Sequence, residues 1–317
     1  MNRLFILAIV LLAVSCEKDV TKKIDVSNID VNIEIDRFEQ KFYTADVNSL
    51  EDLKGRYPYL FPVQNDSIWL NKIKNEEEVE LFERSQEIFK NFDVEKAQIK
   101  DLFKHIKYYH PSFKSPKIIS LITNLDYENK VIYADSLLFV SLDMYLGENS
   151  EVYEDFPRYL SANFDKSRLV VDIAEHISEK YFIAGKKRQF LDVIINEGKK
   201  MYLLDSYLPS ISDAVKIGYS EEKYKWMLAN ETPVWKYFIE KKLLYSTDSK
   251  LYTRFVANAP FSKFYIDIDK ESPGRVGVWL GWQIVRSYMK NNNVTLHQLL
   301  QTNAEDIFKK SKYKPKK

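Results

Sequence analysis

The chain has few of the residues that cross-link a fold or interrupt its helices. It contains one cysteine, 8 glycines and 10 prolines among 317 residues, so no disulfide can form within it. Its stability must come from packing, for which 19 Phe, 21 Tyr and 5 Trp supply large side chains. An excess of charge of one sign is also missing. The 47 Lys and Arg residues oppose 46 Asp and Glu residues, which argues against a general affinity for nucleic acid or anionic lipid.

The one cysteine, Cys16, follows a segment with the pattern of a secretory signal. This segment has a basic start, an apolar run over 4–14 and a small residue at its exit. The run is shorter than the roughly 20 residues that span a bilayer. Ala13-Val14-Ser15-Cys16 resembles a bacterial lipobox, at which the signal is removed and the cysteine receives acyl chains such as palmitate. We therefore expect a signal peptide over 1–15 and lipidation of Cys16; a plain signal peptide with an incidental thiol is the alternative.

Lipidation of Cys16 predicts a location in the cell envelope. Two or more acyl chains hold a protein stably on a membrane, whereas one holds it only marginally. We expect a chain anchored by lipid in the inner or outer membrane and facing the periplasm. Residues 16–30 would form a polar tether and residues 31–317 a single globular domain. The membrane is then one predicted partner, and nucleic acid is not.

The spacing of apolar residues predicts an α+β fold that is mostly helical, with a small sheet followed by a helical bundle. Residues 31–150 should hold helices and the sheet, and residues 151–317 the helical part. Strands are expected where polar residues alternate with apolar ones or β-branched runs end at turns, over 31–36, 117–123, 131–134 and 137–142. Helices are expected where apolar residues recur every three or four positions, over 37–43, 76–91, 94–109, 156–164, 168–182, 187–204, 221–244, 276–290, 296–300 and 304–310. Asn75 and Asp93 are the expected caps of the second and third of these helices.

The predicted helix over 168–182 carries the first candidate site. Asp172 and His176 are one turn apart, so both side chains point the same way and could share a metal ion. Glu197 lies on the next predicted helix. The arrangement resembles a degenerate zinc metallopeptidase of the gluzincin type, in which two histidines and a downstream glutamate bind zinc. Asp172 replaces the first histidine, and Ile173 replaces the glutamate that would act as general base.

Isoleucine cannot accept a proton, so we predict a protein that is not an enzyme and needs no cofactor. Other interpretations stay open. Asp172, His176 and Glu197 could form a vestigial site for zinc or a ligand, or line a cleft that holds a peptide. The helix could equally be an amphipathic surface helix whose charged residues face water. An active metallopeptidase-like hydrolase is the opposed hypothesis.

The stretch over 272–289 is the most distinctive sequence after Cys16. Gly277 and Gly281 are one turn apart on its predicted helix, which allows another backbone to approach closely. The spacing of its glycines does not match the G-x-G-x-x-G pattern of a nucleotide-binding loop. One interpretation is therefore a tightly packed helix that closes the core.

Two tryptophans and two arginines of the same stretch offer a second interpretation. Trp282 and Arg286 are four residues apart, so they could form a cation–π cluster together with Trp279. A surface for a ligand or partner would then consist of Arg275, Trp279, Trp282 and Arg286.

These segments together resemble the gliding motility lipoprotein GldB family of Bacteroidetes-type bacteria. The resemblance rests on PGRVGVWLGWQIVRSYM at 273–289, IEIDRF at 33–38, EGK at 197–199, NETPVW at 230–235 and IFKKSKYKPKK at 307–317. It extends over essentially the whole chain. It implies a cell-envelope lipoprotein required for gliding motility and associated with motility and type IX secretion proteins. It offers no catalytic residues to carry over.

Overall fold

The computed structural model describes residues 24–63 and 65–315. The predicted signal peptide and Cys16 lie outside the described residues. Most of the described chain is helical and one small sheet lies between the helices, as predicted. Among the described helices, none combines the length and apolar character that a membrane span requires.

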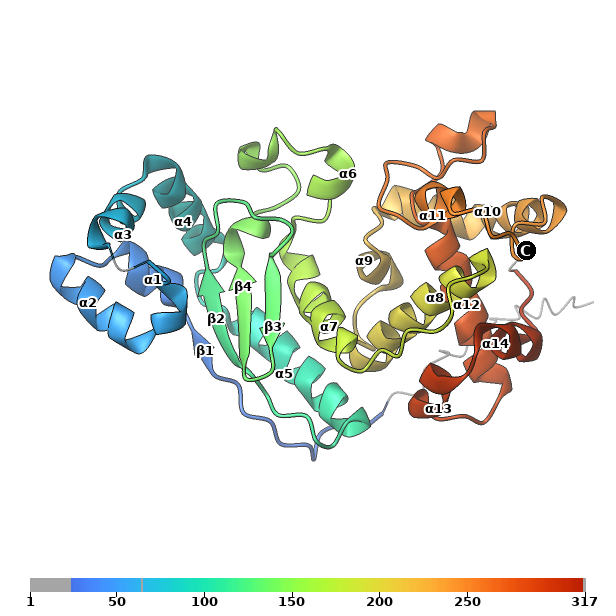
Figure 1. Cartoon of the computed structure of the whole chain (residues 1–317), viewed down its shortest axis with the longest axis horizontal. Helices are drawn as coiled ribbons and strands as arrows, with labels where there is room; N and C mark the ends of the chain where they lie inside the picture. The colour runs from blue at the N-terminus through green and yellow to red at the C-terminus, as the bar shows by residue number, and fades with distance from the viewer. Residues whose placement is uncertain (1–23, 64, 316–317) are drawn as a thin grey trace, which may run out of the picture.

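The elements follow one another along the long axis of the molecule (Figure 1). The first four helices form one end, the sheet lies in the middle with α5 and α7 beside it, and α8–α14 form the other end. The helices of the first end are α1 (Phe38–Tyr43), α2 (Val47–Arg56), α3 (Asp66–Ile73) and α4 (Glu76–Ile88).

The sheet has four strands in the order β1-β2-β4-β3. They are β1 (Ile35–Asp36), β2 (Lys117–Leu121), β3 (Val131–Ala134) and β4 (Leu137–Ser141). The first three in this order are parallel, and β3 forms an antiparallel hairpin with β4. The predicted strand over 31–36 shortens to two residues, because only Ile35 and Asp36 pair with β2.

Alternate residues of the sheet face two separate cores. Ile118 and Leu138 join the main core, which includes α5 (Asp93–Tyr109) and α7 (Leu169–Glu179). Ile119 and Phe139 face a smaller, aromatic-rich core formed with α1–α3. This division follows from the two-residue period of a strand.

Two long helices, α8 (Phe190–Tyr207) and α12 (Val276–Asn291), form the centre of the helical end. A Cβ on Gly281 would lie 1.8 Å from the carbonyl oxygen of Ile194, and one on Gly198 would lie 2.3 Å from the carbonyl group of Gly281. The predicted close approach at Gly281 is therefore confirmed. Around this pair lie α9 (Asp213–Ile217), α10 (Glu221–Glu240), α11 (Lys250–Phe255), α13 (Leu296–Gln301) and α14 (Ala304–Ser311), while the short α6 (Arg158–Ser161) precedes α7.

The two predicted helix caps have different outcomes. The Asn75 side chain accepts the backbone N–H of Glu78 and caps α4, as predicted. The predicted cap at Asp93 is wrong, because α5 begins at Asp93 itself and the buried Phe92 occupies the cap position with φ 54°. Helices α2, α3, α9 and α11 were not predicted, since each is too short for a clear helical period.

The last residues of the predicted tether are packed against the domain. Val26 is buried, while Lys104 and Lys107 of α5 donate to the backbone oxygens of Ser27 and Asp30. The ordered domain therefore includes residues before 31.

Candidate functional site

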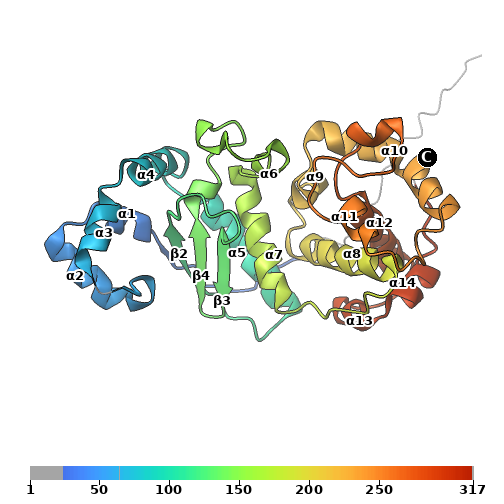
Figure 2. The same cartoon turned by 45° about the horizontal axis from the view of Figure 1, so that its top comes forward.

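Asp172 lies at the centre of a buried ion cluster on α7. Its carboxylate accepts bonds from Lys130 Nζ at 2.5 Å, Arg168 Nη2 at 2.8 Å and the Tyr145 hydroxyl at 3.0 Å. The side chain is fully buried, because α7 packs beside β3 on one side and α8 on the other (Figures 1 and 2). We call these four residues the Asp172 cluster. The interpretation of α7 as a surface helix with water-facing charges is therefore wrong for Asp172.

The environment keeps the Asp172 carboxylate ionised. Burial by itself would raise the pKa of Asp172, but the charges of Arg168 and Lys130 and the hydrogen bonds lower it below the usual range. A buried carboxylate with three donors has its charge compensated. It offers little room for a metal ion as a further partner.

The structure does not assemble the predicted metal site. His176 Nδ1 lies 2.8 Å from the backbone oxygen of Asp172, and Glu197 pairs with Lys200 one turn further along α8. No group of three His, Cys, Asp or Glu side chains within residues 24–63 and 65–315 could hold a metal ion. The vestigial zinc site at Asp172, His176 and Glu197 is therefore not formed, because Lys130 and Arg168 occupy the carboxylate.

The tryptophans of α12 do not form a partner surface. Trp279 is 2% exposed and Trp282 is fully buried, and their indole N–H groups donate to Glu231 and Asp205. The Arg286 guanidinium lies 3.9 Å from the Trp282 ring centre, so the predicted cation–π pair is confirmed. The prediction of an exposed surface is wrong because these rings close the core between α8, α10 and α12.

Arg275 differs from the other three residues of that predicted surface. It precedes α12 in the left-handed conformation, with φ 61°, and its Nη1 donates to the backbone oxygen of Ile217 at 2.9 Å. Its side chain lines a cavity with a volume of about 700 Å³.

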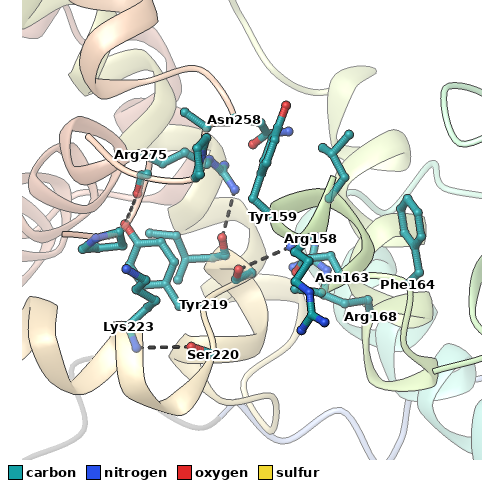
Figure 3. Close-up of a pocket in the computed structure, with 18 of the residues that line it drawn as sticks. Arg158, Tyr159, Asn163, Phe164, Arg168, Tyr219, Ser220, Lys223, Asn258 and Arg275 are labelled. Carbon is teal, nitrogen blue, oxygen red and sulfur yellow. Dashed lines mark hydrogen bonds between the residues drawn. The ribbon is translucent and has the colours of Figure 1, made fainter. Parts of the chain in front are cut away.

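The cavity lies beside α7, where α6, the start of α10 and the loops at 258–260 and 273–275 meet (Figure 3). Two carboxylates, Glu128 and Glu175, line it. The cationic lining residues are Lys130, Arg158, Arg168, Lys223 and Arg275. Positive side chains therefore outnumber negative ones along its wall.

Only part of this positive charge is neutralised. Lys130 and Arg168 pair with Asp172, and Arg168 also reaches Glu175 at 3.4 Å. The other three cations, Arg158, Lys223 and Arg275, have no carboxylate partner within the described part of the chain. The cavity thus offers unpaired positive charge to a ligand.

A family model described as gliding motility protein GldB matches residues 19–315. The chain belongs to the GldB family. This membership supports an involvement in gliding motility and, because the family is of lipoprotein type, an association with the cell envelope. No curated protein and no solved structure gives a significant match.

Sequence reasoning missed the cavity of this GldB-family chain. Arg158, Lys223 and Arg275 come from three separate segments and share no motif. Of the three, only Arg275 was singled out, as part of a different surface. No periodic or spacing signal connects them, because packing alone brings their segments together.

Proposed function

We propose that this GldB-family chain is a lipid-anchored component of the gliding machinery that acts by binding and not by catalysis. Cys16 would carry the lipid, and the folded domain would face the periplasm. Its partners would be envelope proteins of the motility and type IX secretion systems. Family membership supports the link to gliding, and the lipobox-like sequence before Cys16 supports the anchor.

The Asp172 cluster is the observation that carries the non-catalytic part of this proposal. A zinc peptidase of the resembled type needs free ligands and a carboxylate base on this helix. Here the Asp172 carboxylate is saturated by Lys130, Arg168 and Tyr145, and a buried Ile173 follows it. These features favour a rigid wall over a reaction centre.

Complementation of a deletion strain tests this function. Cells that produce the wild-type chain should glide, whereas cells that produce Cys16→Ala should lose both gliding and membrane attachment of the protein. The His176→Ala chain should support wild-type gliding, like the matched change at the exposed His297. Gliding is measured by time-lapse microscopy, and attachment by immunoblotting of membrane fractions.

Two results would contradict the proposal. Normal gliding of the deletion strain would remove the link to motility. Stoichiometric zinc in the purified wild-type protein, lost together with gliding in His176→Ala, would favour the metallopeptidase-like alternative.

Crosslinking in intact envelopes should also recover motility or secretion subunits with the wild-type chain.

A further inference from the structure

We infer that the cavity beside α7 binds an acidic polypeptide segment of a partner protein. This assignment deepens the proposed function, because it names the chemistry that the binding component would recognise. The observations that carry it are the unpaired cations, the amino end of α10, and the size and mixed lining of the cavity.

The three unpaired cations reach the cavity from different sides. Figure 3 shows Arg275 near the start of α12, Lys223 on α10 and Arg158 on α6. Within the described residues, the side chains of Lys223 and Arg275 bond only to backbone oxygens, which leaves their positive charge uncompensated. Positive charges that come from separate sides favour an extended ligand with several carboxylates over a single phosphate ion.

Arg168 adds positive charge to the wall of the cavity. This residue is 7% exposed, and its Nη1 is fixed by the backbone oxygens of Val215 and Lys216. Its Nε has no hydrogen-bond partner within the described residues. This Nε is closed off from solvent, so Arg168 acts on a ligand through its charge, and the three unpaired cations supply the contacts.

The start of α10 adds to the preference for negative charge. Ser220 caps this 20-residue helix and lines the cavity together with Lys223. The amino end of a helix carries a partial positive charge that stabilises nearby anions. It therefore acts in the same sense as the three unpaired cations.

The size and lining of the cavity fit a peptide. About 700 Å³ lies within the range of sites that enclose ligands of several residues or a cofactor. Tyr127 and Tyr159 contribute half-exposed rings to the wall, against which apolar parts of side chains could pack. Glu128 and Glu175 would repel a dense polyphosphate but tolerate a chain of mixed acidic and aromatic residues.

A binding titration tests the assignment with the full chain in detergent. The probe is a short fluorescein-labelled peptide of Glu and Tyr, and the control probe has Gln in place of every Glu. We expect saturable binding of the acidic probe only, with an affinity that falls as salt is added. Fluorescence anisotropy gives the dissociation constants.

Charge reversal at the wall provides the matched variants. Arg158 is exposed in the wall and is not a partner in the ion pairs that the described residues form there, so Arg158→Glu should leave the fold intact. It should weaken binding of the acidic probe by about tenfold. Lys225→Glu makes the same change of charge on an exposed part of α10 outside the cavity, and it should change the affinity by less than about twofold. Circular dichroism confirms that both variants are folded.

Three outcomes would overturn the assignment. The first is that the Gln probe binds as tightly as the acidic probe. The second is that wild type and Arg158→Glu have the same affinity for the acidic probe. The third is that inorganic phosphate, at a concentration equal to that of the peptide, displaces the peptide. The last would assign a phosphate ligand instead. None of these measurements depends on gliding, so a failure here is distinguishable from a failure of the proposed function.

Discussion

Two buried aspartates, Asp172 on α7 and Asp205 on α8, have the same kinds of partners but different surroundings. Each carboxylate accepts bonds from one lysine, one arginine and one aromatic side chain: Lys130, Arg168 and Tyr145 for Asp172, and Lys216, Arg286 and Trp282 for Asp205. In both cases burial would raise the pKa of the aspartate, and the neighbouring cations lower it below the usual range.

The two clusters differ in how completely they are closed. Arg286 makes a two-point contact with Asp205, at 2.7 Å and 2.7 Å, and a second one with Asp213. Lys130 and Arg168 instead line the cavity, and Arg168 keeps an unpaired Nε. The ion pairs around Asp205 therefore stabilise the packing of helices in the core. The similar ion pairs around Asp172 form part of the wall of the cavity.

Removal of each buried negative charge should give the largest effect. Asp205→Asn leaves Lys216 and Arg286 buried without full compensation, so it should lower the free energy of unfolding by about 3–5 kcal/mol. Asp172→Asn should cost less, about 1–3 kcal/mol, because its two cations border the cavity, where water can solvate them. Urea unfolding measures both values, and equal losses would contradict the difference in closure.

A methyl group at the contact of α8 and α12 should push these two helices apart and so disturb the bond between Trp282 and Asp205. Gly281→Ala would place its Cβ 1.8 Å from the Ile194 oxygen, so the helices must separate, at a cost of about 3 kcal/mol. The tryptophan fluorescence should change, because Trp282 lies at this contact. Gly55→Ala is the matched control on α2, where no atom lies within 4 Å of the new Cβ. It should stabilise the protein by about 0.5 kcal/mol, and a comparable loss in both variants would refute the explanation.

Removal of the aromatic hydrogen-bond donor from each cluster should have a smaller effect on stability than removal of the aspartate charge. Trp282→Phe removes the N–H that bonds Asp205 at 2.8 Å and weakens the stacking with Arg286, so it should cost about 2 kcal/mol. Tyr145→Phe removes only the hydroxyl bonded to Asp172 and should cost about 1 kcal/mol. The change in the urea midpoint measures both costs. A larger loss in Tyr145→Phe than in Trp282→Phe would contradict the difference in closure between the two clusters.

Between pH 4 and 6.5, neither Asp172 nor Asp205 should make the stability of the protein depend on pH, because the pKa of each is lowered below its usual range. Burial, helped by the charge of His297, lowers the pKa of His110 to about 4, against 6.5 in the unfolded chain. The unfolded chain therefore binds more protons between these values, and stability should fall as the pH drops from 6.5 to 4. In His110→Gln this loss should shrink by about 1 kcal/mol, after allowance for the partial exposure of the ring. Urea midpoints across this pH range test it, and an unchanged pH slope would place the titration elsewhere.

Local sequence signals identified most elements of the fold. The strand over 131–134 has the predicted bounds, and the Asn75 cap is present, because alternation and capping depend on neighbouring residues. Helices α2 and α3 also have caps, Asp46 and Asn65, but they were not predicted because they are short, and their contacts with the aromatic core of α1 stabilise them.

The ligation state of Asp172 could not be predicted in this way. Its spacing from His176 is compatible with a metal site, but Lys130 reaches the carboxylate from the loop before β3. That contact depends on how the hairpin packs beside α7. Lys130, which is distant in the sequence, therefore makes Asp172 a member of an ion cluster and not a metal ligand.

The amino-acid sequence by itself determined the helical α+β class, the lipobox-like segment at Cys16 and the resemblance to GldB, because these depend on local pattern and residue identity. Only the tertiary structure decided which charges are buried, which are paired and where a cavity opens. The physical reason is that the cost of a charge depends on its surroundings. Those surroundings are assembled here from segments far apart in the chain.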